Sequence, residues 1–272
     1  MDLYLQVSLA SSKLLTKAYS TSFSLGIRTL DEKVHDPIYA IYGFVRLADE
    51  IVDTFHEQDK AALLQRFRED TYRAIEEKIS LNPILHSFQW AVNKFGMERE
   101  LIDAFLYSME LDLTKRDYNP EEYKQYIYGS AEVVGLMCLR VFCDGNPAAY
   151  ESLREDACAL GSAFQKINFL RDIRSDYDER GRVYFPGVDF TTFTDAEKKE
   201  IEADIQLDFD AGLRGIHRLP SVARKGCLLA YEYYIRLFEK IKALPAARIK
   251  EERIRVADWE KMFIYFQLAL RK

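Results

Sequence analysis

Helical periodicity is the feature that most restricts the folds open to this chain. Apolar residues recur at intervals of three and four along nearly all 272 residues, which is the spacing of one face of an α-helix. Short alternating runs bounded by turns, typical of strands, are nearly absent. The pattern predicts an all-α protein, with helices at 3–19, 34–57, 60–78, 81–94, 97–115, 120–143, 148–179, 194–214, 219–243 and 248–270.

The breaks between these helices are short. The 7 prolines and 12 glycines lie mostly between periodic segments. Asn82-Pro83, Asn119-Pro120 and Asn146-Pro147 each have the form of a turn that starts the next helix. Because no linker, repeat or low-complexity run interrupts the chain, we expect a single domain over residues 1–272.

Composition and charge exclude some classes of function. A hydrophobic share of 48% is ordinary for a globular protein with a sizeable core. The net charge of -6 argues against nucleic-acid binding, which needs a basic face. The four cysteines show no CxxC pairing, and the four histidines are scattered. We therefore expect reduced core cysteines, as in a cytosolic protein, and no imidazole metal site.

The two ends of the chain bear on localisation. The start, MDLYLQVSLASSK, lacks the long apolar region of a signal peptide, and no apolar run reaches about 18 residues. These features predict a cytoplasmic protein. The apolar tail from Trp259 to Lys272 is interpreted as a core helix that closes the bundle. The alternative is an interfacial helix in peripheral contact with the inner face of the membrane.

A first acidic pair, Asp49 and Asp53, lies in the segment RLADEIVD. Residues four apart stack on one helix face about 6 Å apart, and like charges at that spacing repel. Arg46 could offset the repulsion through a surface salt bridge, but such bridges contribute little. The preceding IYAIYGFV is apolar all round, which predicts burial. Buried carboxylates need partners or a metal.

A second acidic pair, Asp172 and Asp176, repeats the same spacing in FQKINFLRDIRSD. Gln165 and Asn168 extend its face by two more turns, between largely apolar flanks. A solvated helix face explains most single DxxxD motifs. Two of them on apolar helices predict a metal site.

Carboxylate oxygens suit Mg²⁺, with Mn²⁺ as a substitute, and Mg²⁺ readily shares its ligands with phosphate oxygens. Two facing pairs could hold Mg²⁺ against a diphosphate and neutralise the charge that develops as it leaves. The carbocation left behind would be stabilised by aromatic rings, which fits an aromatic share of 13%.

Two further segments carry groups suited to phosphate. The run YSTSF, with Ser20 and Ser22, offers hydroxyl and backbone N–H groups, although a capping turn explains such a run equally well. The segment RGRVYFP adds Arg182 and Tyr184 after a helix break at Gly181. Arginine forks match phosphate oxygens.

Five segments, taken in their order along the chain, resemble the squalene and phytoene synthase family. They are YSTSF, RLADEIVD, YIYGSAEVVGLM (126–137), FQKINFLRDIRSD and RGRVYFP. The resemblance covers about residues 10–260, and the length is similar to that of bacterial phytoene and dehydrosqualene synthases. It implies an isoprenoid-synthase helical bundle around a central cavity. It also implies a head-to-head condensation of two prenyl diphosphates through a cyclopropyl diphosphate.

The resemblance also assigns residues. The catalytic and Mg²⁺-binding aspartates would be Asp49, Asp53, Asp172 and Asp176, with Asn168 assisting. The substrate-binding set would be Ser20, Ser22, Phe23, Tyr42, Arg46, Gln165, Asn168, Arg171, Arg182 and Tyr184. One departure stands out: Glu132 occupies a place where the family has a small residue, and it would lie near the pocket or turn outward.

The product stays open between two lengths. The first expectation is phytoene from geranylgeranyl diphosphate, without NADPH. The alternative is a C30 product from farnesyl diphosphate, with bulky residues around Val133, Val134 and Met137 setting the depth of the tunnel. A third hypothesis, a non-catalytic assembly factor on the same scaffold, is disfavoured because all four aspartates are present.

Overall fold

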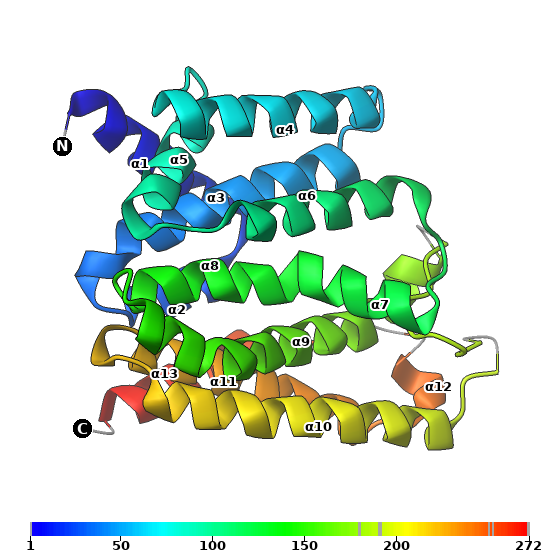
Figure 1. Cartoon of the computed structure of the whole chain (residues 1–272). Helices are drawn as coiled ribbons and strands as arrows, with labels where there is room; N and C mark the ends of the chain where they lie inside the picture. The colour runs from blue at the N-terminus through cyan, green and yellow to red at the C-terminus, as the bar shows by residue number, and fades with distance from the viewer. Residues whose placement is uncertain (1, 179–180, 190–191, 250, 252, 271–272) are drawn as a thin grey trace.

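The computed structural model describes residues 2–178, 181–189, 192–249, 251 and 253–270, and its elements are helical (Figure 1). The helices are α1 (Leu3–Tyr19), α2 (Thr21–Arg28), α3 (Glu32–Asp53), α4 (Lys60–Glu77), α5 (Pro83–Phe95), α6 (Arg99–Thr114), α7 (Pro120–Ile127), the π-helical turn η1 (Tyr128–Glu132), α8 (Val133–Phe142), α9 (Pro147–Asp178), α10 (Asp195–Arg218), α11 (Ser221–Lys242), α12 (Ala246–Ile249) and α13 (Asp258–Leu270). The all-α prediction is confirmed.

Local sequence explains where the helices begin. The Asn119 side chain accepts hydrogen bonds from the first turn of α7, and the Glu122 carboxylate accepts one from the Asn119 backbone. Thr194 and Glu197 form the same reciprocal capping box at α10. Such caps satisfy backbone N–H groups that have no partner inside the helix. The predicted Asn-Pro helix starts follow from this chemistry.

One continuous apolar core runs between the helices, from Leu5 in α1 to Val256 near the C-terminal end. At its centre Phe44 of α3 is fully buried and stacks on Phe88 of α5 with ring centroids 3.9 Å apart. The long helices α9 and α10 run side by side, and the two ends of the chain lie at the same end of the molecule (Figure 1). The prediction of a single domain stays a prediction.

Several helix predictions need correction, among them the end of α10, which lies at Arg218 and not at 214. The segment after Ser20 forms the helix α2, because the Ser20 hydroxyl caps it by accepting from the Phe23 backbone N–H. Helix α3 runs over 32–53 and not 34–57. The predicted helix 120–143 contains the turn η1, where a side chain at Gly129 would meet the Ala104 carbonyl oxygen at 2.4 Å. The predicted helix 248–270 is α12, an extended segment and α13.

The segment after α9 turns back over the bundle. Gly181 has a φ of +61°, a conformation that favours glycine, as the predicted helix break requires. An isolated parallel bridge then pairs Val183 with Asp117, and the Val183 N–H donates to the Arg116 carbonyl at 2.7 Å. This return carries Arg182 and Tyr184 from the end of α9 to the end of α6.

Candidate active site

A deep apolar cavity of about 560 Å³ lies between α2, α3, α8, α9, α10 and α11. One stripe of residues on α9 forms a wall of the cavity, and its last three members are polar. The stripe consists of Leu153, Asp156, Ala157, Leu160, Gly161, Phe164, Gln165, Asn168 and Arg171. These positions repeat at intervals of three and four, as one helix face requires. From Leu153 to Arg171 the stripe is about 27 Å long at 1.5 Å per residue.

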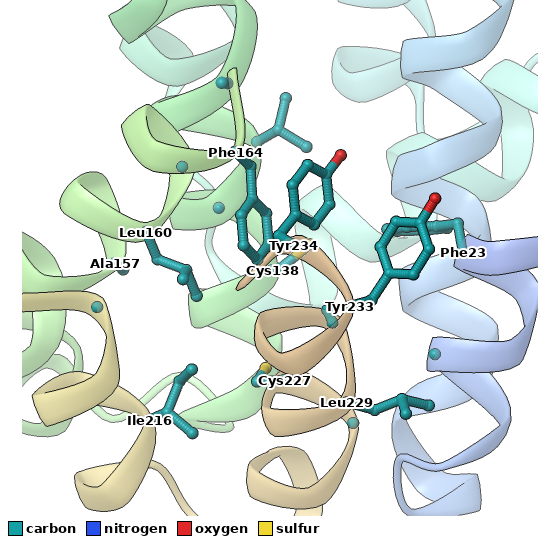
Figure 2. Close-up of a pocket in the computed structure, with 18 of the residues that line it drawn as sticks. Phe23, Cys138, Ala157, Leu160, Phe164, Ile216, Cys227, Leu229, Tyr233 and Tyr234 are labelled. Atoms are coloured by element: carbon teal, nitrogen blue, oxygen red, sulfur yellow. The ribbon is translucent and has the colours of Figure 1, made fainter. Parts of the chain in front are cut away.

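The two ends of this cavity differ in chemistry. Phe142, Leu153, Ile216 and Leu219 line one end, whereas Ser20, Gln165, Asn168 and Arg171 line the other. Figure 2 shows Leu160 and Ala157 on α9, with Cys227 and Ile216 below them in the view. The arrangement suits a long apolar molecule with a polar or charged head.

The first acidic pair lies on the last two turns of α3, as predicted. Asp49 and Asp53 are each about one-third exposed, and Arg46 lies 3.7 Å from the Asp49 carboxylate. The protein around Asp49 limits its hydration, and the neighbouring Asp53, Asp112 and Glu50 add negative charge, so its pKa rises to about 7 despite Arg46. The predicted repulsion within this pair is therefore present.

A third carboxylate joins this pair. Asp112 of α6 is buried and accepts hydrogen bonds from the Tyr126 hydroxyl at 2.8 and 3.0 Å. Arg182 lies 3.2 Å from the Asp112 carboxylate and donates to the Asp112 backbone carbonyl at 2.6 Å. The same guanidinium is 4.0 Å from Asp53. Asp112 therefore holds Arg182 beside the first acidic pair.

The second acidic motif is held differently. Arg171 donates from Nε to the Asp172 carboxylate at 3.0 Å and pairs with it through a second nitrogen. Arg253, from the extended segment before α13, reaches the same carboxylate at 2.8 Å. The Asp176 side chain lies outside the described residues, although its backbone belongs to α9. Its predicted role stays a prediction.

The two amides lie at the polar end of the cavity. The Asn168 side-chain NH₂ is 3.4 Å from the Gln165 oxygen, and the Tyr234 hydroxyl donates to the Asn168 oxygen at 3.1 Å. Tyr234 also stacks on Phe164 with centroids 4.0 Å apart, and both rings are visible in Figure 2. This contact fixes the polar end of the α9 stripe against α11.

On the α3 side, Phe23 stacks on Tyr42 with centroids 4.3 Å apart, and both line the cavity with Ser20. The Ser20 hydroxyl caps α2 and hydrogen-bonds Tyr42, so the capping interpretation of YSTSF is confirmed for it. Its contact with phosphate stays a prediction. The Ser22 side chain lies outside the described residues.

Tyrosines lie between the two acidic motifs. Electrostatic interaction with Asp49 and Tyr234 contributes to a raised pKa of Tyr42, and interaction with Asp172 contributes to a raised pKa of Tyr234. Burial raises the pKa of both hydroxyls, so both stay protonated at neutral pH. The Tyr234 proton is donated to Asn168. Tyr42 and Tyr234 line the cavity, whereas Asp49, Asp53 and Asp172 are not among its lining residues.

Tyr184 occupies a different place from the other predicted contacts. It is buried and stacks on Phe169 at 4.0 Å and on Tyr118 at 5.5 Å, with its hydroxyl 3.3 Å from Arg182. Through this contact Tyr184 supports Arg182.

The donor set fits a hard divalent cation and a phosphate. Among the described residues, no three His, Cys, Asp or Glu side chains are gathered as a ready-made metal site, and Mg²⁺ typically completes its shell with water and phosphate oxygens. The buried Nε atom of Arg46 has no hydrogen-bond partner within the described part of the chain. An oxygen-rich ligand at this end would satisfy such donors.

The positions expected to set cavity depth need correction. Val134 lines the cavity, but Val133 and Met137 are fully buried in the core and do not. Glu132 does not line it either. Its carboxylate accepts from the Ser162 hydroxyl, and burial raises its pKa. Glu132 thus joins η1 to α9 behind the cavity wall.

Sequence reasoning missed Asp112, Arg253 and Tyr234. Asp112 carried little signal, because Glu110 and Lys115 stand close to it in the helix predicted at 97–115. Arg253 carried none, because it reaches Asp172 through an extended segment that was predicted to be helical.

A helical bundle of this kind around a long apolar cavity is the isoprenoid synthase fold. The sequence model of the squalene/phytoene synthase family matches residues 16–260, and the chain belongs to that family. Family membership confirms the resemblance drawn from the motifs.

Relatives in this family differ in their named products. The chain is 32% identical over 199 residues to presqualene diphosphate synthase from Sinorhizobium fredii, covering 70% of this chain and 67% of the relative. It is 27% identical over 246 residues to chloroplastic phytoene synthase 2 from Oryza sativa, covering 83% of this chain and 61% of the relative. A 4,4'-diapophytoene synthase from Staphylococcus haemolyticus is 28% identical, with 70% and 66% covered. The chain thus spans less than two thirds of the length of several relatives.

Solved structures agree on the fold. A dehydrosqualene synthase superposes with a TM-score of 0.81 at 21% identity, covering 97% of this chain and 96% of the other. Squalene synthase HpnC from Alicyclobacillus acidocaldarius gives 0.79 at 20% identity, with 89% and 96% covered. Among the described residues, none of the helices has the length and apolar character needed to cross a membrane.

Proposed function

We propose that the protein is a phytoene synthase of carotenoid biosynthesis that joins two geranylgeranyl diphosphates head to head. The observation that carries the proposal is the α9 stripe, which is mainly apolar from Leu153 to Phe164, apart from Asp156 in its ion pair with Arg218, and ends in Gln165, Asn168 and Arg171. A prenyl chain would lie along the apolar part, with its diphosphate at the polar end.

Four carboxylates and one amide would hold Mg²⁺ there: Asp49 and Asp53 from α3, and Asn168, Asp172 and Asp176 from α9. When bound, Mg²⁺ supplies positive charge that stabilises the departing diphosphate. Arg46, Arg171 and Arg182 add guanidinium groups suited to phosphate oxygens. Arg171 must then exchange its contact with Asp172 for one with the ligand.

The cavity walls would serve the carbocation. Phe23, Tyr42, Phe164 and Tyr234 present ring faces along the cavity, and such faces stabilise a nearby cation. The apolar lining also excludes water, which would otherwise capture the cation. In this account one substrate loses its diphosphate and the double bond of the second attacks the cation that remains. A proton then leaves as the cyclopropane ring closes, and the cyclopropyl diphosphate loses its own diphosphate, rearranges and loses a second proton.

A second candidate is a C30 synthase that uses farnesyl diphosphate. It is favoured by the similarity to the presqualene diphosphate synthase of Sinorhizobium fredii, whose identity of 32% exceeds the 27% to the rice phytoene synthase. Both candidates use the same polar end of the cavity and differ in the length of chain that the apolar end receives.

The experiment is product analysis. Purified protein is incubated with each prenyl diphosphate in Mg²⁺ buffer, with and without NADPH, and the hydrocarbon mass is measured. We expect a C40 hydrocarbon from geranylgeranyl diphosphate that does not depend on NADPH. A C30 product from farnesyl diphosphate alone would support the second candidate. No condensation product from either substrate would contradict both.

The product has a consequence for location. Phytoene is a hydrocarbon without polar groups, so we propose a cytoplasmic enzyme in peripheral contact with the membrane that receives it.

A further inference from the structure

Helix α13 exposes a stripe of large apolar side chains. Trp259, Met262, Phe263 and Phe266 are 70%, 44%, 57% and 56% exposed. Their spacings of three, four and seven residues place them on one face of the helix. Large contiguous apolar patches are rare on soluble monomers and mark surfaces that bind a partner or a membrane. We call these four residues the α13 stripe.

The opposite face of α13 is fixed to the protein. Glu260 is only 4% exposed, accepts from Arg236 Nε at 3.0 Å and pairs with Lys240, and both partners belong to α11. Lys261 and Ile264 reach the cavity wall. These contacts hold the helix in one orientation, so the α13 stripe is directed away from the body of the protein.

A basic hollow borders the α13 stripe. It has a volume of about 210 Å³ and is lined by Arg28, Thr29, Lys225, Leu229, Tyr265 and Leu268. The Arg28 and Lys225 side chains are exposed, and neither forms an ion pair within the described part of the chain. Tyr265 belongs to the hollow and contacts Phe266 of the stripe, with ring centroids 5.7 Å apart. Apolar and cationic surfaces therefore adjoin.

We propose that α13 is an interfacial helix that docks the protein on an anionic lipid bilayer. The α13 stripe would lie at the boundary of the acyl chains, and Arg28 and Lys225 would meet lipid phosphates. Interfacial helices combine Trp and Phe on one face with nearby cations. At 13 residues, α13 is too short to span a bilayer, which needs about 20 residues.

This inference deepens the proposed function, on which it rests. One face of α13 borders the cavity through Ile264, and the other carries the stripe. A hydrocarbon formed in the cavity would thus be released beside the bilayer. A second copy of the chain could also cover an apolar stripe, but the adjoining unpaired cations favour an anionic lipid surface.

The test is flotation of the purified full-length protein with vesicles of phosphatidylcholine, alone or mixed with phosphatidylglycerol. We expect the protein to float with the anionic vesicles. The double variant Phe263→Glu/Phe266→Glu should bind at least about tenfold more weakly, because it loses buried aromatic surface. The control Leu81→Glu alters a residue that is 94% exposed in the loop before α5 and should bind as the wild type does.

A second variant tests the hollow. Arg28→Gln/Lys225→Gln should lose the preference for anionic vesicles while keeping weak binding to phosphatidylcholine, and added salt should have the same effect. Circular dichroism of each variant checks that the helices are retained.

Three results would overturn the inference. The wild-type protein floats with neither kind of vesicle, or the Leu81→Glu variant loses as much binding as the stripe variant. In the third, the protein does not float and is instead a dimer that Phe263→Glu dissociates. Turnover in detergent is measured separately. Turnover without flotation would leave the proposed function standing and remove the docking surface. Flotation without turnover would support the docking surface and contradict the proposed function.

Discussion

The guanidinium of Arg182 lies 3.2 Å from the carboxylate of Asp112 and 4.0 Å from that of Asp53. One cation thus joins a buried acid on α6 to the first acidic motif on α3. Its position depends on the chain turning back at Gly181 and pairing at Val183. Asp112 is a positioning residue in this arrangement, because its carboxylate and its backbone carbonyl both hold Arg182.

Asp112→Ala should therefore impair both stability and turnover. Asp112 and Arg182 have side chains only 6% and 9% exposed, and removing one partner of a buried pair typically costs about 3–5 kcal/mol. Urea unfolding measures this loss. On the same helix, Glu110 is 53% exposed and pairs with Arg68, so Glu110→Ala should cost less than about 1 kcal/mol. Equal losses in the two variants would contradict the role of Asp112.

The raised pKa of Asp49 predicts a pH dependence of stability. Its pKa moves from 3.8 to about 7, so between these values the folded protein holds a proton that the unfolded chain has released. The stability contribution of Asp49 therefore falls as pH rises through this window and stays low above it.

Asp49→Asn removes this titration. In buffer without divalent metal, the variant should melt at a higher temperature than the wild type at pH 8, and the difference should vanish near pH 4. Asp36→Asn, on an exposed position of the same helix, serves as the control and should show no such trend. If the difference in melting temperature between the wild type and Asp49→Asn is the same at pH 8 and near pH 4, the raised pKa of Asp49 is contradicted.

The cavity wall at Ala157 should set product length. Ala157 lies on the α9 stripe toward the apolar end, so Ala157→Phe should fill space needed by the far end of a longer chain. Product analysis should show a loss of C40 product with less effect on C30 product. Glu155→Phe adds the same ring on an exposed face of α9 and should leave the product ratio unchanged. A reduced yield with an unchanged ratio in Ala157→Phe would contradict this assignment.

Arg253 should contribute to the second motif without being needed for folding. It is 51% exposed and lies 2.8 Å from Asp172, so Arg253→Ala should retain the fold by circular dichroism. We expect a higher KM for the diphosphate substrate, because the variant removes a cation from the polar end. Arg255→Ala alters an exposed neighbour and should keep the wild-type KM. If both variants behave alike, Arg253 has no specific role.

The sequence predicted most helices because helical periodicity and Asn-Pro starts are local signals. It missed α2 because a Ser- and Thr-rich run also suits a turn, and only the Ser20 cap distinguishes the two. The π-helical turn at Gly129 depends on close packing against Ala104, which no local pattern encodes.

The same division holds for the site. The positions of Asp49, Asp53 and Asp172 on helices could be predicted because each repeats a helical spacing beside apolar residues. Their role in binding Mg²⁺ stays a prediction. Asp112 and Arg253 could not, because their neighbours in space are distant in sequence. Val133 and Met137 were wrongly expected in the tunnel wall, since the sequence does not show which face of a uniformly apolar helix meets the cavity.

The central claim is that the acidic motifs of α3 and α9 act together on one Mg²⁺-bound diphosphate. The most direct test is Mg²⁺-dependent hydrocarbon formation by Asp49→Asn and by Asp172→Asn, with folding checked by circular dichroism. We predict that each variant folds and that each loses at least about a hundredfold in turnover. Near-normal turnover in either folded variant would contradict the claim.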